Sequence, residues 1–318
     1  MKVSIVIPNY NGEELLKKNL PVVFEASNYY SQKSGENTEI VIVDDASTDN
    51  SLDEIQNAKS KSQNFKLKLK SIKNKENVGF ALTANRGVKE AEGEIIVLLN
   101  TDVIPQKDFL EPLINHFKDE EVFAVGCMDK SIEGDKIVLR GRGIGSWQQG
   151  FLVHRKGEIN KTNTLWVTGG SGAFRKSIWN KLNGFSQLYN PFYWEDIDLS
   201  YRAQKSGYKV LFEPNSIVVH EHEKGSIKKK YSPFQIKTIT YKNQIVFSWK
   251  NITDYNLLIS HVAWLPYHLF RALINFDVPF LLGFFNAFFL LPSIIFSRYK
   301  TKQFFVKTDK EIIQELGE

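Results

Sequence analysis

Cysteine is almost absent from this chain: Cys127 is the only one among 318 residues. A single cysteine excludes a disulfide framework within the chain, which is typical of proteins in a reducing compartment. Cys127 ends the apolar run 122–127, so we expect a buried core thiol there rather than a nucleophile. The apolar run 3–7 stops at Pro8 and is too short for a signal peptide, so we expect none.

Several functional motifs are also missing. The sequence has no Gly-x-x-x-x-Gly-Lys phosphate loop, no zinc-spaced set of Cys and His, and no nucleic-acid-binding module. We therefore expect no nucleic-acid partner. Hydrophobic residues make up 42% and charged residues 24%, which is the balance of a globular protein. The net charge of +5 is mild and fits an anionic ligand, an anionic membrane or an ordinary solvated surface equally well.

The first hundred residues alternate between strand and helix patterns. Strands are expected at 3–7, 40–43, 66–72 and 95–99, and helices at 13–28, from about 49, and at 80–91. Short, continuously apolar strands separated by helices predict a parallel sheet with helices on both faces, an α/β fold. Ligands bind such sheets at the carboxyl ends of the strands. Those ends are polar here, at 8–11, 44–45 and 100–102.

The middle of the chain is less regular. Residues 129–165 are rich in glycine and turn-prone, so we expect hairpins or loops that shape an acceptor side. A strand from Trp166 is expected to precede the glycine-rich turn 169–172. A helix at 197–205 and short strands at 208–212 and 217–219 complete this part.

The last third of the chain is markedly apolar. Between 257 and 296 the only formally charged residues are Arg271 and Asp277. The uncharged run 278–296 would be about 28 Å long as a straight helix, close to the thickness of a bilayer core. Prolines divide this region into pieces of roughly a dozen residues, which lie in a membrane interface more readily than they span it. They are Pro266, Pro279 and Pro292.

A basic cluster follows the apolar region at once: Arg298, Lys300 and Lys302. Such a cluster is expected at an anionic, cytoplasmic lipid surface. We therefore expect residues of about 257–297 to attach the protein to the cytoplasmic face of the inner or plasma membrane, as a peripheral or monotopic segment. The alternative is a soluble helical subdomain packed on the rest of the chain.

Two acidic turns at strand ends favour a nucleotide site. A hard divalent cation, Mg²⁺ or Mn²⁺, bridges the oxygens of a nucleoside diphosphate when the protein supplies a carboxylate. Asp102 is the expected ligand, and Asn100 offers an amide oxygen to the metal or a hydrogen bond to the ribose. Of Asp44 and Asp45, one carboxylate is expected to accept from a uracil, thymine or guanine N–H. The bland alternative for such turns is helix capping.

Taken in order, these stretches resemble the inverting family 2 glycosyltransferases of GT-A fold, and within them a rhamnosyltransferase-like subgroup. The matching stretches are 3–12, 41–49, 77–80, 85–87, 98–102, 169–175 and 194–199. The resemblance covers about residues 1–225. It implies a Rossmann-like nucleotide-binding sheet in a domain of residues 1–230, with a nucleotide-binding half, 1–105, and an acceptor and catalytic half, 106–230. Residues 231–318 would form a C-terminal helical region.

The resemblance also implies roles for single residues. The nucleotide sugar is expected to contact Pro8, Tyr10, Asn11, Glu13, Asp44, Asn77, Gly79, Asn100, Thr101 and Asp102. The acceptor or sugar side is expected to include Gly169, Gly170 and Trp194, although Trp194 and the aromatic residues before it are also explained by packing. The metal is expected to bind Asp102 and His220, with His222 the poorer candidate. Family members usually have Asp where this chain has Asn100, so Asp102 is the firm carboxylate ligand.

Glu195 and Asp196 resemble the catalytic motif of the family, with Asp196 as general base. Direct displacement at the anomeric carbon needs a carboxylate that takes the proton of the acceptor hydroxyl, and it inverts the configuration. The alternative reading of these two residues is favourable charge at a helix N-terminus. Both readings are compatible with each other.

The sequence therefore predicts transfer of a sugar from a UDP-, GDP- or dTDP-sugar to a hydroxyl of a glycan or lipid-linked acceptor, in cell-surface polysaccharide synthesis, with Mn²⁺ or Mg²⁺. Two alternatives stay open. One is a non-catalytic, nucleotide-sugar-binding membrane scaffold. The other is a nucleotidyltransferase on a related fold, which would need a basic loop near 8–13, but no Lys or Arg lies between residue 8 and Lys17.

Overall fold

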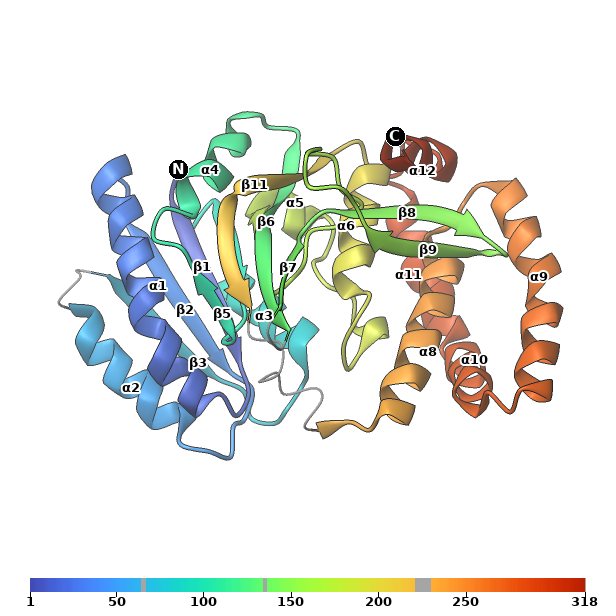
Figure 1. Cartoon of the computed structure of the whole chain (residues 1–318), viewed down its shortest axis with the longest axis horizontal. Helices are drawn as coiled ribbons and strands as arrows, with labels where there is room; N and C mark the ends of the chain where they lie inside the picture. The colour runs from blue at the N-terminus through green and yellow to red at the C-terminus, as the bar shows by residue number, and fades with distance from the viewer. Residues whose placement is uncertain (64–66, 134–135, 221–229, 318) are drawn as a thin grey trace.

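A central mixed sheet runs through the N-terminal two thirds of the protein in the computed structural model, which describes residues 1–63, 67–133, 136–220 and 230–317 (Figure 1). Its strands are β1 (Val3–Asn9), β2 (Thr38–Asp44), β3 (Lys68–Lys73), β4 (Ile95–Leu99), β5 (Val103–Pro105), β6 (Val122–Glu133), β7 (Lys136–Arg140), β10 (Ser171–Arg175) and β11 (Lys209–His220). Their order is β3-β2-β1-β4-β10-β6-β11-β5, and β7 pairs with β6.

The predicted parallel sheet is confirmed for the first four strands, which all run in the same direction. β10, which lies outside that prediction, is antiparallel to β4 and β6. The chain enters β10 through a turn at the carboxyl end of β4, where Ser171 pairs with Leu99, so β10 has to run backwards. The strand expected from Trp166 is not formed, and β10 begins at Ser171, inside the glycine-rich stretch 169–172. The two short strands expected after residue 208 form the single strand β11, with irregular register between Glu213 and Ile217.

Helices cover both faces of the sheet, as the continuous apolar strands predict. On one face lie α1 (Glu13–Ser34), α2 (Ser51–Ser62) and α4 (Leu110–Asn115). On the other lie α3 (Phe80–Glu90), α5 (Lys176–Lys181) and α6 (Glu195–Lys205). Helix α1 runs beyond the expected residue 28 and ends at Gly35, whose φ of 74° is the left-handed conformation that commonly terminates helices.

A third core joins the sheet domain to the C-terminal helices. The hairpin of β8 (Gly143–Gln148) and β9 (Phe151–Lys156) confirms the expectation of hairpins between 129 and 165. Residues of this hairpin and of α6 pack against α8 (Pro233–Asn251), α10 (Val278–Phe289), α11 (Leu291–Lys302) and α12 (Asp309–Gly317). The proposed boundary at residue 230 stays a prediction, because the two parts share this core.

The prolines of the apolar region act differently from one another. Pro266 lies inside α9 (Tyr255–Ile274), so the expectation that it ends a helix is wrong. Pro279 and Pro292 lie in the first turns of α10 and α11, where the missing N–H costs no hydrogen bond. The run 278–296 is therefore not one helix, since α10 and α11 are bent by 63° relative to each other.

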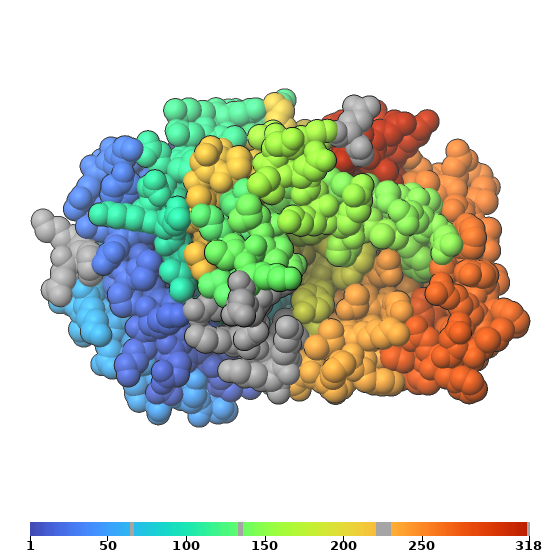
Figure 2. All heavy atoms as spheres, viewed as in Figure 1, coloured from blue at the N-terminus to red at the C-terminus, as the bar shows by residue number. Residues whose placement is uncertain are grey.

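Helix α9 is apolar and largely uncovered. Its 20 residues are long and apolar enough to cross a membrane, and only 11% of its apolar window is buried. The C-terminal helices form one end of the molecule, opposite α1 and α2 (Figure 2). Of the three expected lipid-facing cations, Arg298 turns inward instead, because its Nη1 donates to Trp249 O at 3.0 Å. Lys300 stays exposed, with its ammonium 4.2 Å from the centre of the Phe296 ring.

Candidate active site

The polar ends of β1, β2 and β4 lie at one edge of the sheet. Asn9 pairs in register with Asp44, and Asn9 Nδ2 donates to Asp44 Oδ1 at 2.9 Å. Asp44 is fully buried and also accepts the backbone N–H of Ser47 at 3.1 Å. This carboxylate therefore holds the strand end and the following turn together, and its contact with a base stays a prediction.

The neighbouring carboxylate, Asp45, holds the expected nucleotide floor. Its two oxygens accept the backbone N–H groups of Val78, at 3.0 Å, and Gly79, at 2.9 Å. Gly79 has a φ of 86°, a conformation that glycine adopts without the penalty that a Cβ brings. Asn77 is exposed beside it. From the sequence, one carboxylate of the acidic pair was expected to have a role. In the structure, each of the two carboxylates accepts hydrogen bonds from a different loop.

Asn11 and Glu13 tie the loop after β1 to the turn after β2. The backbone N–H of Asn11 donates to Ser47 Oγ at 2.9 Å, and its Oδ1 accepts the N–H of Thr48 at 2.8 Å. Glu13 Oε1 accepts the side-chain amide of Asn50 at 3.1 Å. Both side chains thus shape the loop in which we expected them to contact the nucleotide.

Pro8 and Tyr10 are half-buried at the same edge. The ammonium of Lys230 lies 4.9 Å from the centre of the Tyr10 ring, within the range of a cation–π contact. A cation over this loop favours an anionic ligand. His222, the poorer candidate for the metal, lies outside the described residues.

The turn after β4 is fixed by its neighbours. The backbone N–H of Asn100 donates to Gly170 O at 2.9 Å, and the side-chain amide of Asn19 donates to Thr101 O at 2.7 Å. A Cβ at Gly170 would lie 2.6 Å from Asn100 Nδ2, so a larger residue there would displace the Asn100 side chain. The expected corner at 100–102 and the turn at 169–170 are therefore in direct contact.

Asp102 faces His220, which ends β11. Asp102 Oδ2 lies 3.2 Å from His220 Nε2, and Asp129 Oδ2 lies 3.1 Å from His220 Nδ1. Burial alone would lower the pKa of His220, but hydrogen bonds to Asp102 and Asp129 outweigh it and raise the pKa to about 9. The sequence analysis did not predict a role for Asp129. Its only signal in the sequence is its position just after the strand expected at 122–127.

These residues fit a divalent metal in part. Adjacent ligands of an octahedral ion at about 2.1 Å are roughly 3 Å apart, which matches the separation of Asp102 Oδ2 and His220 Nε2. Asp129 is the kind of carboxylate that accepts the Nδ1–H of a ligating histidine and leaves Nε2 for the metal. Among the described residues, no group of three or more His, Cys, Asp and Glu side chains is arranged to hold an ion. Diphosphate oxygens and water would have to complete the shell.

Glu195 and Asp196 form the first turn of α6, which begins two residues earlier than expected. Glu195 is buried, and its Oε2 has no hydrogen-bond partner among the described residues, whereas Asp196 is half-buried. Asp196 accepts the backbone N–H of Ile197 at 2.8 Å and is also reached by the backbone of Gly169. Burial raises the pKa of both carboxyl groups, and repulsion from Asp196 raises that of Glu195 further.

The two residues before this motif have strained backbones. Tyr193 has a φ of 68° and Trp194 a φ of 75°, and neither is glycine. Asn243 of α8 holds this segment: its Nδ2 lies 2.9 Å from Phe192 O, 2.8 Å from Tyr193 O and 2.9 Å from Tyr189 O. Strain of this kind persists only where the surroundings over-determine the conformation. Asn243 lies far along the chain from the motif, so no local pattern indicated its role.

Trp194 is a core residue. Its side chain is only 4% exposed, and its ring lies 5.2 Å from those of His154 and Phe247. The structure therefore favours packing over sugar stacking for Trp194. The preceding Tyr193 is 42% exposed and is the aromatic side chain of this segment that is open to a ligand.

A buried ionic network anchors α6 from behind. Asp198 pairs with Arg202, at 2.8 Å, and with Lys250 of α8, at 2.6 Å, and accepts from Asn251 and Tyr189. Burial opposes the charge of Asp198, but Arg202 and Lys250 outweigh this and lower its pKa to about 2. The network was missed from the sequence because its partners are far apart in the chain.

The comparisons with known proteins agree with this geometry. The family model described as glycosyl transferase family 2 matches residues 4–182, more than half of the chain, and that of glycosyl transferase family group 2 matches 95–296. The chain therefore belongs to glycosyltransferase family 2. The rhamnosyltransferase-like subgroup stays a prediction.

The curated relatives that match most of the chain include the following enzyme. It is a dolichyl N-acetyl-alpha-D-glucosaminyl phosphate 3-beta-D-2,3-diacetamido-2,3-dideoxy-beta-D-glucuronosyltransferase of Methanococcus voltae, 25% identical over 260 residues, which cover 75% of this chain and 71% of that protein. Other curated glycosyltransferases match over shorter stretches, and the matched region spans only 30% to 35% of their length.

Solved structures show the fold. The S. aureus TarS fragment 1–349 in complex with UDP-GlcNAc has a TM-score of 0.60 at 15% identity, covering 99% of this chain and 91% of that one. The mannosyltransferase PcManGT from Pyrobaculum calidifontis, in complex with GDP-Man and Mn²⁺, has a TM-score of 0.56 at 17% identity, covering 95% and 86%. The predicted GT-A fold is thereby confirmed.

Proposed function

We propose that this protein is an inverting glycosyltransferase that moves a sugar from a nucleoside-diphosphate sugar to an acceptor hydroxyl. The main support for the proposal is that one turn contacts both parts of the site. Gly170 O accepts the backbone N–H of Asn100 at the end of β4, and the backbone of Gly169 forms a hydrogen bond with Asp196. A carboxylate whose pKa is raised by burial is a better proton acceptor than an ordinary aspartate. Asp196 thus suits a general base close to the corner expected to hold the diphosphate.

The reaction follows from these positions. Asp196 takes the proton of the acceptor hydroxyl as the new bond forms at the anomeric carbon and the bond to the diphosphate breaks. One displacement through an oxocarbenium-like transition state inverts the anomeric configuration. A divalent ion held by Asp102 and His220 would neutralise the charge of the departing diphosphate. Asp129 would keep His220 in the orientation that this requires.

Both UDP- and GDP-sugars belong in the donor screen, because the two similar structures hold UDP-GlcNAc and GDP-Man. A dTDP-sugar tests the rhamnosyltransferase-like subgroup. Binding and turnover are measured with Mn²⁺ and with a chelator. Donor turnover that is insensitive to the chelator would remove the metal from the proposal and leave the base in place.

The test of the base is Asp196→Asn. We expect the variant to bind donor as the wild type does and to lose transfer, because the amide accepts no proton. Asp53→Asn, an exposed position on α2, is the matched control and keeps full activity. Transfer by Asp196→Asn at the wild-type rate would refute the assignment, and donor binding without any turnover in the wild type would favour the non-catalytic scaffold. Family membership leaves no reason to keep the nucleotidyltransferase alternative.

We further propose that α9 lies on the cytoplasmic face of a membrane and that the acceptor is lipid-linked, in cell-surface polysaccharide synthesis. Several large apolar side chains of α9 are exposed: Tyr255, Ile259, Val262, Phe270 and Leu273. The opposite side is tied to the β8–β9 turn, where His268 donates to Gln149 O at 2.8 Å and His261 Nδ1 lies 2.7 Å from Gly150 O. Such polar contacts favour a helix that lies on the membrane over one that crosses it.

The relative from Methanococcus voltae supports a lipid-linked acceptor, because its name describes a dolichyl-linked substrate. The test of attachment is sedimentation with vesicles of mixed phosphatidylcholine and phosphatidylglycerol. Replacing Val262 and Phe270 together by serine should abolish sedimentation, whereas the same change at Ile137 of β7, which is 68% exposed, should not. Sedimentation of the double variant at the wild-type level would argue against α9 as the attachment.

A further inference from the structure

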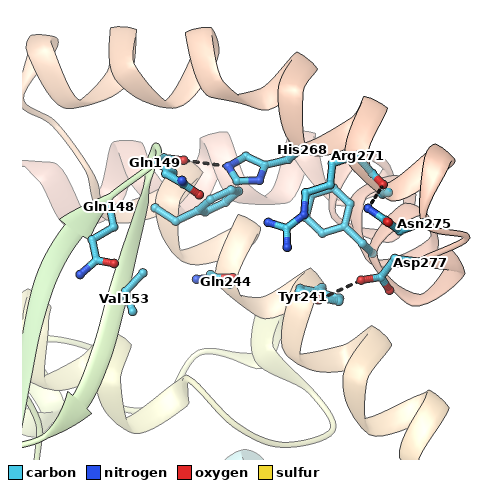
Figure 3. A pocket seen from close by; sticks show the side chains of 12 residues that line it. Gln148, Gln149, Val153, Tyr241, Gln244, His268, Arg271, Asn275 and Asp277 are labelled. Atoms are coloured by element: carbon cyan, nitrogen blue, oxygen red, sulfur yellow. Dashed lines mark hydrogen bonds between the residues drawn. The ribbon is translucent and has the colours of Figure 1, made fainter.

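A cavity of about 370 Å³ lies between the β8–β9 hairpin and helices α8, α9 and α10 (Figure 3). It is separate from the candidate active site, since none of the expected site residues lines it. Its polar lining comes mainly from Gln148, Gln149, Tyr241, Gln244, His268 and Arg271.

Both charged residues of the apolar region 257–296 line this cavity. The charge of Asp277 is balanced: its Oδ1 lies 3.1 Å from Lys237 Nζ, and its Oδ2 accepts from the hydroxyl of Tyr241 at 3.1 Å. The guanidinium of Arg271 has no ion pair or hydrogen bond within the described part of the chain, and Figure 3 shows it pointing into the cavity. One uncompensated positive charge therefore faces the space.

The surroundings of Arg271 indicate which class of anion would bind in the cavity. Phe270 and Leu273, its neighbours on α9, are 64% and 59% exposed, and Phe276 beyond them is 85% exposed. An exposed guanidinium that lines a cavity beside an exposed apolar surface matches a molecule that has an anionic head and an apolar tail. The planar fork of arginine pairs with phosphate through two parallel hydrogen bonds.

Helix α8 separates the cavity from the catalytic loop. Tyr241 and Gln244 face the cavity, whereas Lys242 and Asn243, between them in the chain, contact carbonyl groups of residues 188–193. Lys242 Nζ donates to Asn190 O at 2.6 Å. A ligand in the cavity would thus be held one helix away from the segment that leads into Asp196.

We propose that this cavity binds the phosphate head group of a membrane lipid through Arg271. The inference rests on the proposed function and deepens it, because the carrier of a lipid-linked acceptor is a lipid of this class. Inorganic phosphate offers the same chemistry without the tail, and the experiment separates the two sources.

The experiment measures sedimentation of the full chain with phosphatidylcholine vesicles, with and without phosphatidic acid, at low and at raised salt. Arg271→Gln should lower the affinity for the phosphatidic acid vesicles by about tenfold, the size expected for lost hydrogen bonds to a charged group. Arg271→Lys keeps the charge but not the fork, so it should be intermediate. Lys300→Gln, the matched control, removes an exposed charge outside the cavity, and its smaller effect should vanish at raised salt.

Several results would overturn the proposal. One is wild-type affinity of Arg271→Gln at raised salt. Another has two parts: inorganic phosphate alone raises the Tm of the wild type but not of Arg271→Gln, and the variant binds vesicles as the wild type does. This result would assign the site to a soluble anion. Donor binding by Arg271→Gln should equal that of the wild type, which also shows that the variant is folded. Asp196→Asn should bind vesicles normally, so failure of the lipid site and failure of the proposed chemistry are distinguishable.

Discussion

Replacing Asn243 by aspartate tests whether one buried amide holds the catalytic segment in shape. The change keeps the size of the side chain but replaces its N–H₂ donor by an oxygen. That oxygen would face the carbonyl groups of Tyr189, Phe192 and Tyr193, all within 2.9 Å of the present nitrogen. Acceptor then faces acceptor in a site with no solvent, because Asn243 is fully buried.

The magnitude follows from the hydrogen bonds and the strain. An amide nitrogen carries two hydrogens, so about two full hydrogen bonds are lost, each contributing about 1 to 1.5 kcal/mol net. The left-handed conformations of Tyr193 and Trp194 cost about 1 to 2 kcal/mol each. These two quantities are similar, so without the hydrogen bonds the segment should relax. We expect a loss of about 2 to 3 kcal/mol in the free energy of unfolding and a fall in kcat, because Asp196 follows directly.

The assay combines urea unfolding, donor affinity and turnover. Donor affinity should stay close to that of the wild type, because the strand ends at Asp44 and Asn100 do not contact Asn243. Gln244→Glu is the matched control: the same amide-to-acid change on the next residue removes one hydrogen bond, to Leu152 O at 3.2 Å, and should cost no more than about 1 kcal/mol. Wild-type kcat and stability in Asn243→Asp would refute the reasoning.

Three further outcomes are expected. Asp198→Ala should lower the free energy of unfolding by about 3 to 5 kcal/mol in urea, because it leaves Arg202 buried without its partner; a loss below about 1 kcal/mol would contradict the network. Since burial raises the pKa of Asp196, its base form is lost at a higher pH than for an ordinary aspartate, so kcat/KM should fall on mild acidification; a profile flat down to about pH 4 would count against it. Asp129→Asn should weaken Mn²⁺ binding in the presence of nucleotide by about tenfold or more, because His220 loses the acceptor that orients it. Titration with Mn²⁺ measures this, and an unchanged affinity would exclude this role of Asp129.

The parts of the fold that the sequence predicted are those that local pattern determines. Residues 40–43 and 95–99 are apolar without interruption, residues 3–7 are apolar except for Ser4, and each is a buried strand with both faces covered. Their polar ends had to meet, because parallel strands end at one edge of a sheet. Asp44 and Asn100 therefore lie at the same edge of the sheet.

The parts that the sequence did not predict depend on contacts across the chain. Asp129 and His220 are 91 residues apart and meet only because β6 and β11 are parallel neighbours. Pro266 was misjudged for a related reason. Proline usually interrupts a helix, but α9 is held on one side by the hairpin turn at Gln149 and Gly150, so tertiary contacts outweigh the local preference.

Helix α8 connects the chemistry to the proposed membrane surface. Its residue Asn243 holds the segment before Asp196, Lys250 pairs with Asp198 behind it, and Tyr241 lines the cavity that contains Arg271. The helix has a capping box at Ser232, and it carries contacts to both the cavity and the catalytic segment. If a lipid phosphate in the cavity moves α8, the position of Asp196 responds. Vesicles that carry phosphatidic acid should then change kcat in the wild type but not in Arg271→Gln, and an equal change in both would show that the cavity and the base are not coupled.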